Sequence, residues 1–196
     1  VSQGFLAYGL ILFASFIPFS FLSTALNRSA SLIVSHGGLV SKVVFPLEIL
    51  PASVLISCLL QLAVTTSILV VVAPLALGTP LSGLLRAVPV LVLHLVFTAG
   101  LTFFLSSLAV FVRDLGSVVG IALQILFFLT PITYPESAFP RRFQWVLDLN
   151  PLAVVVRLWR EALVFGRGPD LSALGTLAAM ALVSFAAGYW WFHRTR

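Results

Sequence analysis

The side chains that could perform catalysis or bind a metal are few and lie far apart in the sequence. The three histidines are His36, His94 and His193, and the single cysteine is Cys58. The sequence has no H-E-x-x-H motif, no G-x-S-x-G motif and no G-x-x-x-x-G-K-[ST] phosphate loop. We therefore expect no catalytic site, no metal site and no cofactor in this chain. If the protein moves a substrate uphill, a partner subunit must bind ATP and Mg²⁺.

Polar residues recur every four positions in two apolar segments. The two stripes are Ser53, Ser57, Gln61 and Thr65, and His94, Thr98, Thr102 and Ser106. A step of four residues drifts by about 40° around a 3.6-residue helix, so each stripe stays within one broad face. Because unpaired polar groups are costly in hydrocarbon, we expect both faces to point into protein or a water-filled cavity.

Two interpretations of these stripes remain open at this stage. They could be helix-packing contacts through small and hydrogen-bonding residues, or they could line a substrate pathway. His94 could be a hydrogen-bonded core histidine or a proton carrier. Aromatic rings could also offer stacking surfaces for sugars. The candidate pathway residues are Phe13, Phe16, Ser57, Gln61, His94, Thr98 and Thr102.

The rarity of charge identifies the class of protein that must position these residues. Of 196 residues, 60% are hydrophobic and 9% are charged, against about 25% charged in soluble domains. Stretches without Asp, Glu, Lys or Arg run over 1–27, 49–85, 87–112, 115–135 and 171–193. Each is long enough to cross ~30 Å of hydrocarbon, which takes about 20 residues. The sequence predicts an all-α polytopic membrane protein with one domain over 1–196. Its spans are expected near 5–26, 51–76, 87–112, 115–134 and 171–192.

The two longest connections between these spans are predicted to contain short helices. Residues 28–50 are interrupted at Gly37-Gly38 and at Phe45-Pro46, which favours a short helix near 29–36 and then a second short piece. In 135–170, Asn150 before Pro151 is typical of a helix start. The net charge of +5 lies at segment ends without a basic patch, so we expect no nucleic-acid partner. Charge counting does not decide the orientation.

The segment from Pro151 to Phe165 has amphipathic spacing. Its apolar residues share one face opposite Arg157, Arg160 and Glu161. Its 15 residues cover only ~22 Å as a helix, which is too short to cross the hydrocarbon. We expect two short re-entrant or interfacial helices on one membrane face.

Four motifs in order carry a resemblance to a known family. The first two are Ser31-Leu32-Ile33 with Gly38 to Pro51, and Val112-Arg113-Asp114. The others are Thr130-Pro131-Ile132-Thr133-Tyr134, and Asn150-Pro151-Leu152 with Arg157 and Gly166. Together they cover nearly all of 28–168, and the chain resembles the ABC-2 type permeases that export polysaccharides and polyol phosphates.

The resemblance implies a six-span subunit of the bacterial plasma (inner) membrane that forms a homodimer and docks separate ATPase subunits. The implied substrate is a lipid-linked glycan such as O-antigen, capsule or teichoic acid, carried across the plasma membrane. Membrane lipids are further expected partners. Since the family has a further helix and span before the position of Val1, we expect an N-terminally truncated chain.

The resemblance also implies roles for particular residues. Segments 28–50, 113–114 and 193–196 would be cytosolic, with Arg113 and Asp114 at the cytosolic end of the third span. Segment 135–170 would form the outer gate together with the residues just before it, and the gate residues would be Pro131, Tyr134, Asn150, Pro151, Arg157 and Arg160. The residues that couple to the ATPase would be Arg28, Ser31, Leu32, His36, Gly37, Gly38, Lys42, Phe45 and Pro46.

Three alternatives to a glycan exporter are a drug or antibiotic exporter of the same superfamily, an intramembrane enzyme acting on lipid-linked substrates, and a purely structural subunit. The drug exporters are less similar to this chain at Phe45-Pro46 and Arg113-Asp114. An enzyme would need a cluster of titratable residues within the membrane, and His94 is the one ionisable side chain well inside a predicted span.

Overall fold

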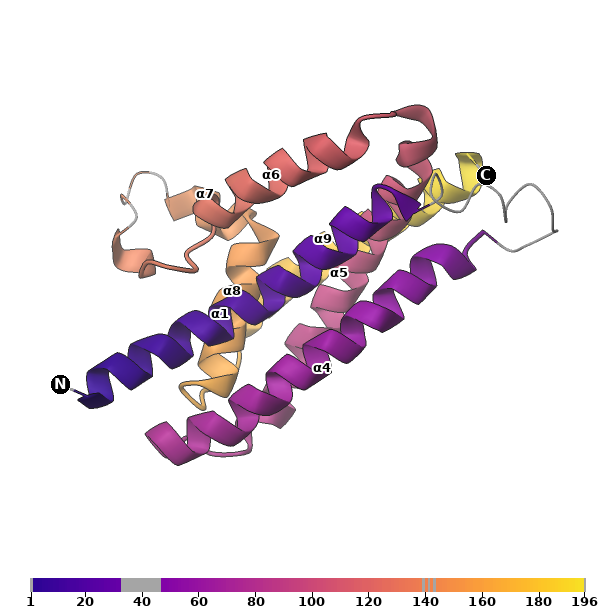
Figure 1. Ribbon diagram of the computed structural model, residues 1–196. Helices are drawn as coiled ribbons and strands as arrows, with labels where there is room; N and C mark the ends of the chain where they lie inside the picture. The colour runs from indigo at the N-terminus through magenta and orange to yellow at the C-terminus, as the bar shows by residue number, and fades with distance from the viewer. Residues whose placement is uncertain (1, 33–46, 139, 141, 143, 196) are drawn as a thin grey trace.

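The described part of the chain is helical. The computed structural model describes residues 2–32, 47–138, 140, 142 and 144–195, and no strand occurs among them. The elements are α1 (Ser2–Ser29), α4 (Ile49–Leu77), α5 (Gly83–Phe111), α6 (Leu115–Leu129), the 3-10 helix η1 (Glu136–Ala138), α7 (Gln144–Leu149), α8 (Pro151–Leu163) and α9 (Leu171–Thr195), shown in Figure 1.

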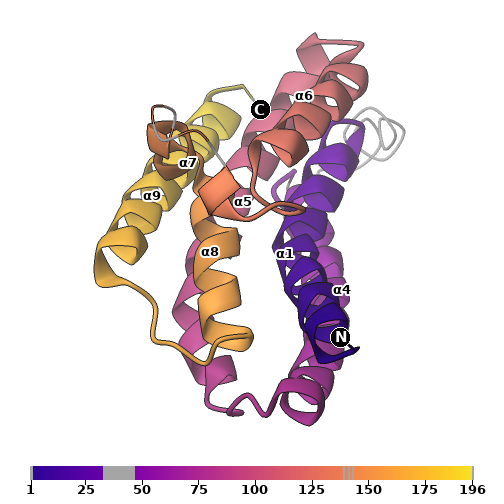
Figure 2. The same ribbon diagram turned by 90° about the vertical axis from the view of Figure 1, so that its left-hand side faces the viewer.

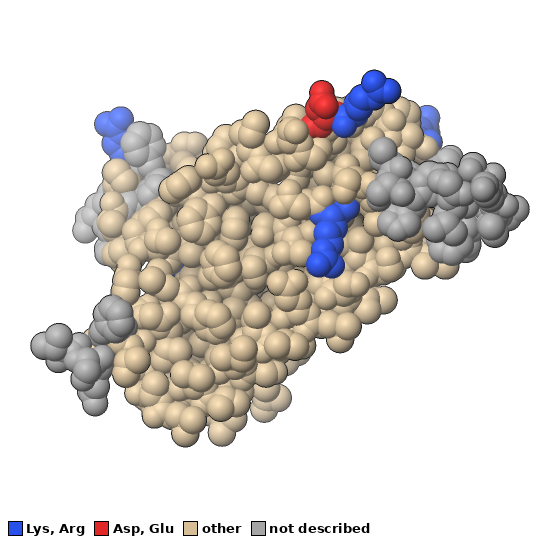
Figure 3. All heavy atoms as spheres, in the orientation of Figure 1, with Lys and Arg blue, Asp and Glu red and all other residues tan. Residues whose placement is uncertain are grey.

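Four of these helices are long and apolar enough to cross a membrane. They are α1, α4, α5 and α9, with mean hydropathies between 1.8 and 2.4. The all-α polytopic class predicted from the sequence is therefore confirmed, and the protein is a multi-pass membrane protein. Apolar side chains lie outward as well as inward. The lower part of the face in Figure 3, over the C-terminal half of α4, consists of uncharged side chains.

Helix α6 is shorter than the span expected over 115–134. It ends at Leu129 after 15 residues, or ~22 Å of helix against ~30 Å of hydrocarbon. Thr130 adopts extended backbone, with φ −96° and ψ 133°, because a residue before proline is disfavoured in the α region. Composition alone could not show this, since the residues after Pro131 are still mostly apolar.

The predicted short helices in 135–170 are confirmed as α7 and α8, but α8 does not lie on a surface. It packs against α1, α5 and α9, and Figure 2 shows it within the bundle between α1 and α9. Most of its side chains are buried, including Val155, Leu158 and Ala162 at no exposure. Its last turn reaches the start of α5, because the carbonyl of Ala162 lies where a Cβ on Gly83 would be.

Helices α5 and α9 cross with their backbones in contact. A Cβ added at Gly188 would collide with the carbonyl of Gly100, and one added at Gly100 would collide with the backbone of Ser184. The Ser184 hydroxyl donates to the carbonyl of Phe97 at 3.1 Å. Small residues allow this approach between membrane helices.

One end of the bundle collects the ends of several helices. His193 on α9 lies 3.6 Å from the Glu48 carboxylate at the start of α4, and the hydroxyls of Ser107 and Thr195 join α5 to α9. The turn between α4 and α5 lies at the opposite end, where Arg86 donates to the carbonyl of Gly166. Glu48 and His193, two of the described residues that the resemblance assigned to the cytosolic side, therefore lie together at one end.

Candidate functional site

The end of α6 and the beginning of α8 are joined by one buried asparagine. The Oδ1 of Asn150 accepts from the backbone N–H groups of Leu152 at 3.0 Å and Ala153 at 3.3 Å. Its Nδ2 donates to Thr130 Oγ1 at 3.0 Å. The predicted helix start is confirmed, and the same side chain also ties α8 to Thr130, the first residue after α6.

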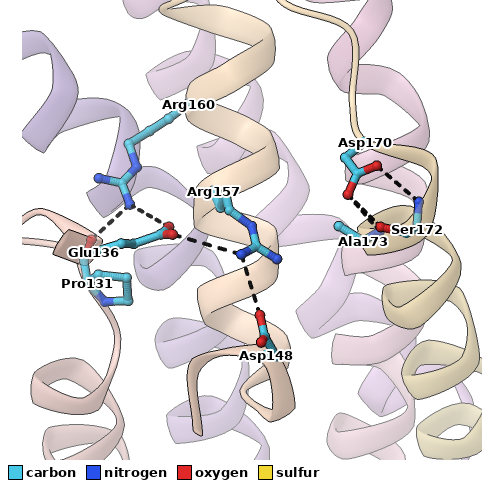
Figure 4. Close-up of polar contacts among 8 residues, drawn as sticks. All are labelled: Pro131, Glu136, Asp148, Arg157, Arg160, Asp170, Ser172 and Ala173. Carbon is cyan, nitrogen blue, oxygen red and sulfur yellow. Dashed lines mark hydrogen bonds and ion pairs between the residues drawn. The ribbon is translucent and has the colours of Figure 1, made fainter. Parts of the chain in front are cut away.

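A cluster of four charged side chains lies beside this junction, as Figure 4 shows. Arg160 donates from Nη2 to the carbonyl of Pro131 at 3.0 Å and lies 3.7 Å from Glu136. Arg157 lies 3.8 Å from the same carboxylate and 3.5 Å from Asp148. Glu136 therefore bridges the two arginines, and η1, α7 and α8 are held together by ion pairs.

The amphipathic spacing predicts that Arg160 lies on an exposed polar face, but the structure buries it. It is 9% exposed, because α8 is surrounded by other helices and its polar side faces the segment that follows α6. Arg157 and Glu161 are half-buried. The buried guanidinium is compensated by the Pro131 carbonyl and by Glu136, as a buried charge requires.

Two cavities adjoin the cluster. One of about 420 Å³ is lined by Tyr8 of α1, Tyr134 and both arginines. Another of about 510 Å³ is mainly polar and includes Asp148, Asp170 and Ser172. Arg157 lines both. Both cavities are therefore bordered by charged groups whose positions are fixed by ion pairs.

Other predicted gate residues lie around the same junction. Tyr134 donates its hydroxyl to the carbonyl of Phe128 at 3.0 Å, Pro131 is buried and Pro151 is half-buried. Asp170 accepts hydrogen bonds from the hydroxyl and backbone N–H of Ser172, and these bonds lower the pKa of its carboxyl.

The polar stripe on α5 is buried. His94 is 2% exposed and Thr98 and Thr102 are fully buried. The Nε2 of His94 lies 3.2 Å from the carbonyl of Pro18 on α1, and Thr98 donates to the His94 carbonyl at 2.8 Å. These contacts favour the packing interpretation for His94, which joins α5 to α1.

The polar stripe on α4 lies on the outside of the described chain, contrary to expectation. Ser53, Ser57 and Gln61 are exposed. The hydroxyl of Ser57 donates to the carbonyl of Ser53 at 2.9 Å, and that of Thr65 to the carbonyl of Gln61 at 3.0 Å. Hydrogen bonds within the helix satisfy these hydroxyls, so the stripe requires no cavity of its own.

The two predicted stacking residues on α1 have different surroundings. Phe13 is half-buried and packs against the core, whereas Phe16 is 49% exposed. The ring of Phe16 lies 6.2 Å from that of Phe19, which lies 5.0 Å from Phe127 of α6. Sequence reasoning missed Phe19 as part of this aromatic row, because its partner belongs to another helix.

The predicted coupling segment is only partly described. Arg28 and Ser31 are exposed and Leu32 is buried, and α1 continues to Ser29, past the span end expected at residue 26. Arg113 and Asp114 are exposed in the link between α5 and α6. Six of the predicted coupling residues lie outside the described residues: His36, Gly37, Gly38, Lys42, Phe45 and Pro46.

No group of three or more His, Cys, Asp or Glu residues that could hold a metal occurs within the described ranges. Cys58 is buried and unpaired with another cysteine. The charged side chains of the cluster instead pair with one another and with the carbonyl of Pro131.

Comparison with known proteins adds a consistent set of similarities. A family described as ABC-2 type transporter matches residues 1–164. The chain is 26% identical over 160 residues to the O-antigen export system permease protein RfbA of Klebsiella pneumoniae, covering 81% of this chain and 62% of that protein. It is 31% identical over 175 residues to a protein of the same name from Myxococcus xanthus, covering 88% and 67%. It is 27% identical over 184 residues to the polysialic acid transport protein KpsM of Escherichia coli, covering 93% and 71%. The chain thus spans less than two thirds of the Klebsiella relative.

Proposed function

The chain belongs to the ABC-2 type transporter family, and on this premise we propose that it is the membrane-spanning permease subunit of an ATP-driven glycan exporter. Its substrate is a lipid-linked polysaccharide or polyol phosphate polymer, carried across the bacterial plasma (inner) membrane. The names of the relatives support this substrate class, since they are permeases for O-antigen and a transporter of polysialic acid.

The observation that best supports transport is the non-helical backbone after α6, where Thr130 is held by Asn150 at the start of α8. Non-helical backbone at membrane depth is tolerated where it is buried in protein or lines a water-filled cavity. Ionisable residues within membrane proteins mark substrate pathways. Here Arg160 donates to the carbonyl of Pro131 at the break, and the cavity of about 420 Å³ adjoins the residues that follow it. A subunit with a purely structural role has no need of this costly arrangement.

Energy for export comes from a partner in this proposal. A separate ATPase subunit binds ATP and Mg²⁺ and docks at the end of the bundle that contains Arg28 and the link at Arg113-Asp114. Segment 28–50 then transmits its movement to α1 and α4, because it joins those two helices directly. A second copy of the chain completes the pathway as a homodimer, and that end faces the cytosol.

Replacement of the chromosomal gene by variants tests this function. Glu136→Gln removes the carboxylate that bridges both arginines, so we expect less glycan at the cell surface while the protein level in the membrane is unchanged. Arg167→Gln is the matched control, because Arg167 is exposed and lies over the ring of Phe165 outside the cluster. A null strain that displays normal amounts of every surface glycan would contradict the proposal.

A further inference from the structure

The break after α6 lies within the thickness of the bilayer. Arg113 and Asp114 are exposed just before α6, and they mark the hydrocarbon boundary at which it begins, because charged side chains are costly in hydrocarbon. The 15 residues of α6 rise by at most ~22 Å, whatever its tilt, against ~30 Å of hydrocarbon. Thr130 is therefore at least ~8 Å short of the opposite boundary. Asn150, which donates to Thr130, places the start of α8 close to the same depth.

The mainly polar cavity of about 510 Å³ reaches a similar depth from the opposite boundary. Asp170 is exposed at the start of α9 and marks that boundary. The cavity extends from Asp170 to Thr176 on the second turn of α9, or up to ~9 Å inward. Asp148 and Arg157 also line it (Figure 4), and their side chains are 66% and 31% exposed. Exposed charges at this depth require water around them, so water is the medium that fits this cavity.

Carboxylates outnumber arginines around this cavity and its neighbour of about 420 Å³. The described charged residues that line the two cavities are two arginines and four acids, with a formal charge of −2: Arg157, Arg160, Glu136, Asp148, Glu161 and Asp170. Both arginines are already paired with Glu136 or Asp148. Glu161 and Asp170 are therefore in excess. Hydrogen bonds from Ser172 lower the pKa of Asp170, which keeps this carboxylate ionised at neutral pH.

Arg86 and Arg167 are near in the sequence or the fold, but they do not offset this excess inside the cavities. Arg86 donates to the carbonyl of Gly166, and Arg167 lies over the ring of Phe165. Neither arginine lines either cavity. A cavity that is lined by one sign of charge and has low-dielectric walls focuses the field, and such fields change the association rate of a charged solute by about 10-fold or more.

From the depth of the polar cavity and its charge we propose that Glu161 and Asp170 select the charge of the exported polymer. The cavity is a water-filled vestibule that admits a neutral polysaccharide and repels polyanions, including polyol phosphates. This inference rests on the proposed function, which leaves the charge of the polymer open. A neutral glycan offers hydroxyl groups that donate to the carboxylates, whereas each anionic repeat unit adds to the repulsion.

The field in the vestibule can be measured with two membrane-impermeant methanethiosulfonate reagents of opposite charge. In a Cys58→Ser background with the ATPase subunit present, Thr176→Cys places a thiol on the wall of the vestibule. We expect the cationic reagent to modify it about 10-fold faster than the anionic reagent, after correction for their rates with free cysteine. Equal corrected rates would overturn the proposal. Failure of both reagents to react would also overturn it, because the cavity would then hold no water.

Neutralising the excess carboxylates locates the source of the field. Glu161→Gln combined with Asp170→Asn should bring the two corrected rates at Thr176→Cys close to each other. Ser82→Cys is the matched control, because Ser82 is exposed in the turn between α4 and α5 and lines neither cavity. Its corrected rates should not change when the same two carboxylates are neutralised. An unchanged preference at Thr176→Cys, or equal changes at both positions, would show that the field does not arise in the vestibule.

The surface glycans of the wild-type and null strains test the substrate class itself. We expect composition analysis to show that the polymer missing from the null strain contains no phosphate, uronic acid or sialic acid. If the missing polymer is a polyanion, this inference is overturned while the exporter function stands. If no polymer is missing, the exporter function fails and the inference about its substrate falls with it.

Discussion

Asn150 performs two tasks that can be separated by mutation. Its Oδ1 caps the start of α8, and its Nδ2 ties that start to Thr130. Loss of an N-cap costs about 1 kcal/mol, and loss of a net hydrogen bond costs about 1 kcal/mol more. Asn150→Ala should therefore destabilise the protein by about 2 kcal/mol, which corresponds to about a 30-fold change in the ratio of folded to unfolded protein.

A double-mutant cycle isolates the tie between the two helices. Thr130→Val removes the acceptor and also the hydrogen bond that the hydroxyl donates to the carbonyl of Leu126 at 2.7 Å, so it should cost about 2 kcal/mol. Once Asn150→Ala is present, the same change should cost about 1 kcal/mol less, because the shared hydrogen bond is already gone. The measurement is the free energy of unfolding in detergent micelles, and the coupling should be close to 1 kcal/mol.

The control cycle pairs Thr130→Val with Asp170→Ala. Asp170 caps the start of α9 through Ser172 and Ala173 and shares no hydrogen bond with Thr130, so the two changes should be additive. Coupling near zero between Asn150 and Thr130 would refute the tie. Equal coupling in both cycles would show that the effect is not local to the junction of α6 and α8.

Further predictions concern the helix crossing, pH dependence and orientation. Gly188→Ala should destabilise the protein by about 1–3 kcal/mol because its methyl group would collide with backbone, whereas Gly175→Ala on the same helix meets nothing within 4 Å and should be tolerated when unfolding is measured. The lowered pKa of Asp170 stabilises the folded state above the ordinary aspartate pKa, and that stabilisation is lost as pH falls below about 4; thermal melts of Asp170→Asn should lack this acid loss. In a background without Cys58, Arg157→Cys should react with an impermeant thiol reagent from outside and Arg28→Cys only from the cytosol; the reverse pattern would invert the orientation.

The class of protein and the approximate spans could be predicted because they depend on a one-dimensional property. A run of about 20 apolar residues without charge can cross a bilayer whatever its neighbours are, and four such helices are present. The cap at Asn150 was equally predictable, since it is made within three residues of chain. The end of α6 at Leu129 differs from the expected span end at residue 134 because Pro131 restricts the backbone of Thr130, whatever the apolarity of the residues around it.

Features that depend on tertiary neighbours could not be predicted. Arg160 lies on the polar side of α8, but whether that side meets water or Pro131 depends on where α8 sits. The stripe with Ser57 and the stripe with Thr98 have the same four-residue spacing, yet one is exposed and the other buried. Spacing defines a helix face, and only the packing of the bundle determines what that face contacts.

The contact between Gly100 and Gly188 also has a consequence for biosynthesis. The two glycines are 188 − 100 = 88 residues apart in the sequence, and a ribosome adds ~5–20 residues per second. Helix α5 therefore lacks its partner for roughly 4–18 s, and its backbone at Gly100 faces lipid or the insertion machinery. During that interval another helix with small residues could pack against the same place. Slower translation of Leu171–Thr195, the 25 residues that form α9, would lengthen the time during which the nascent chain depends on a chaperone.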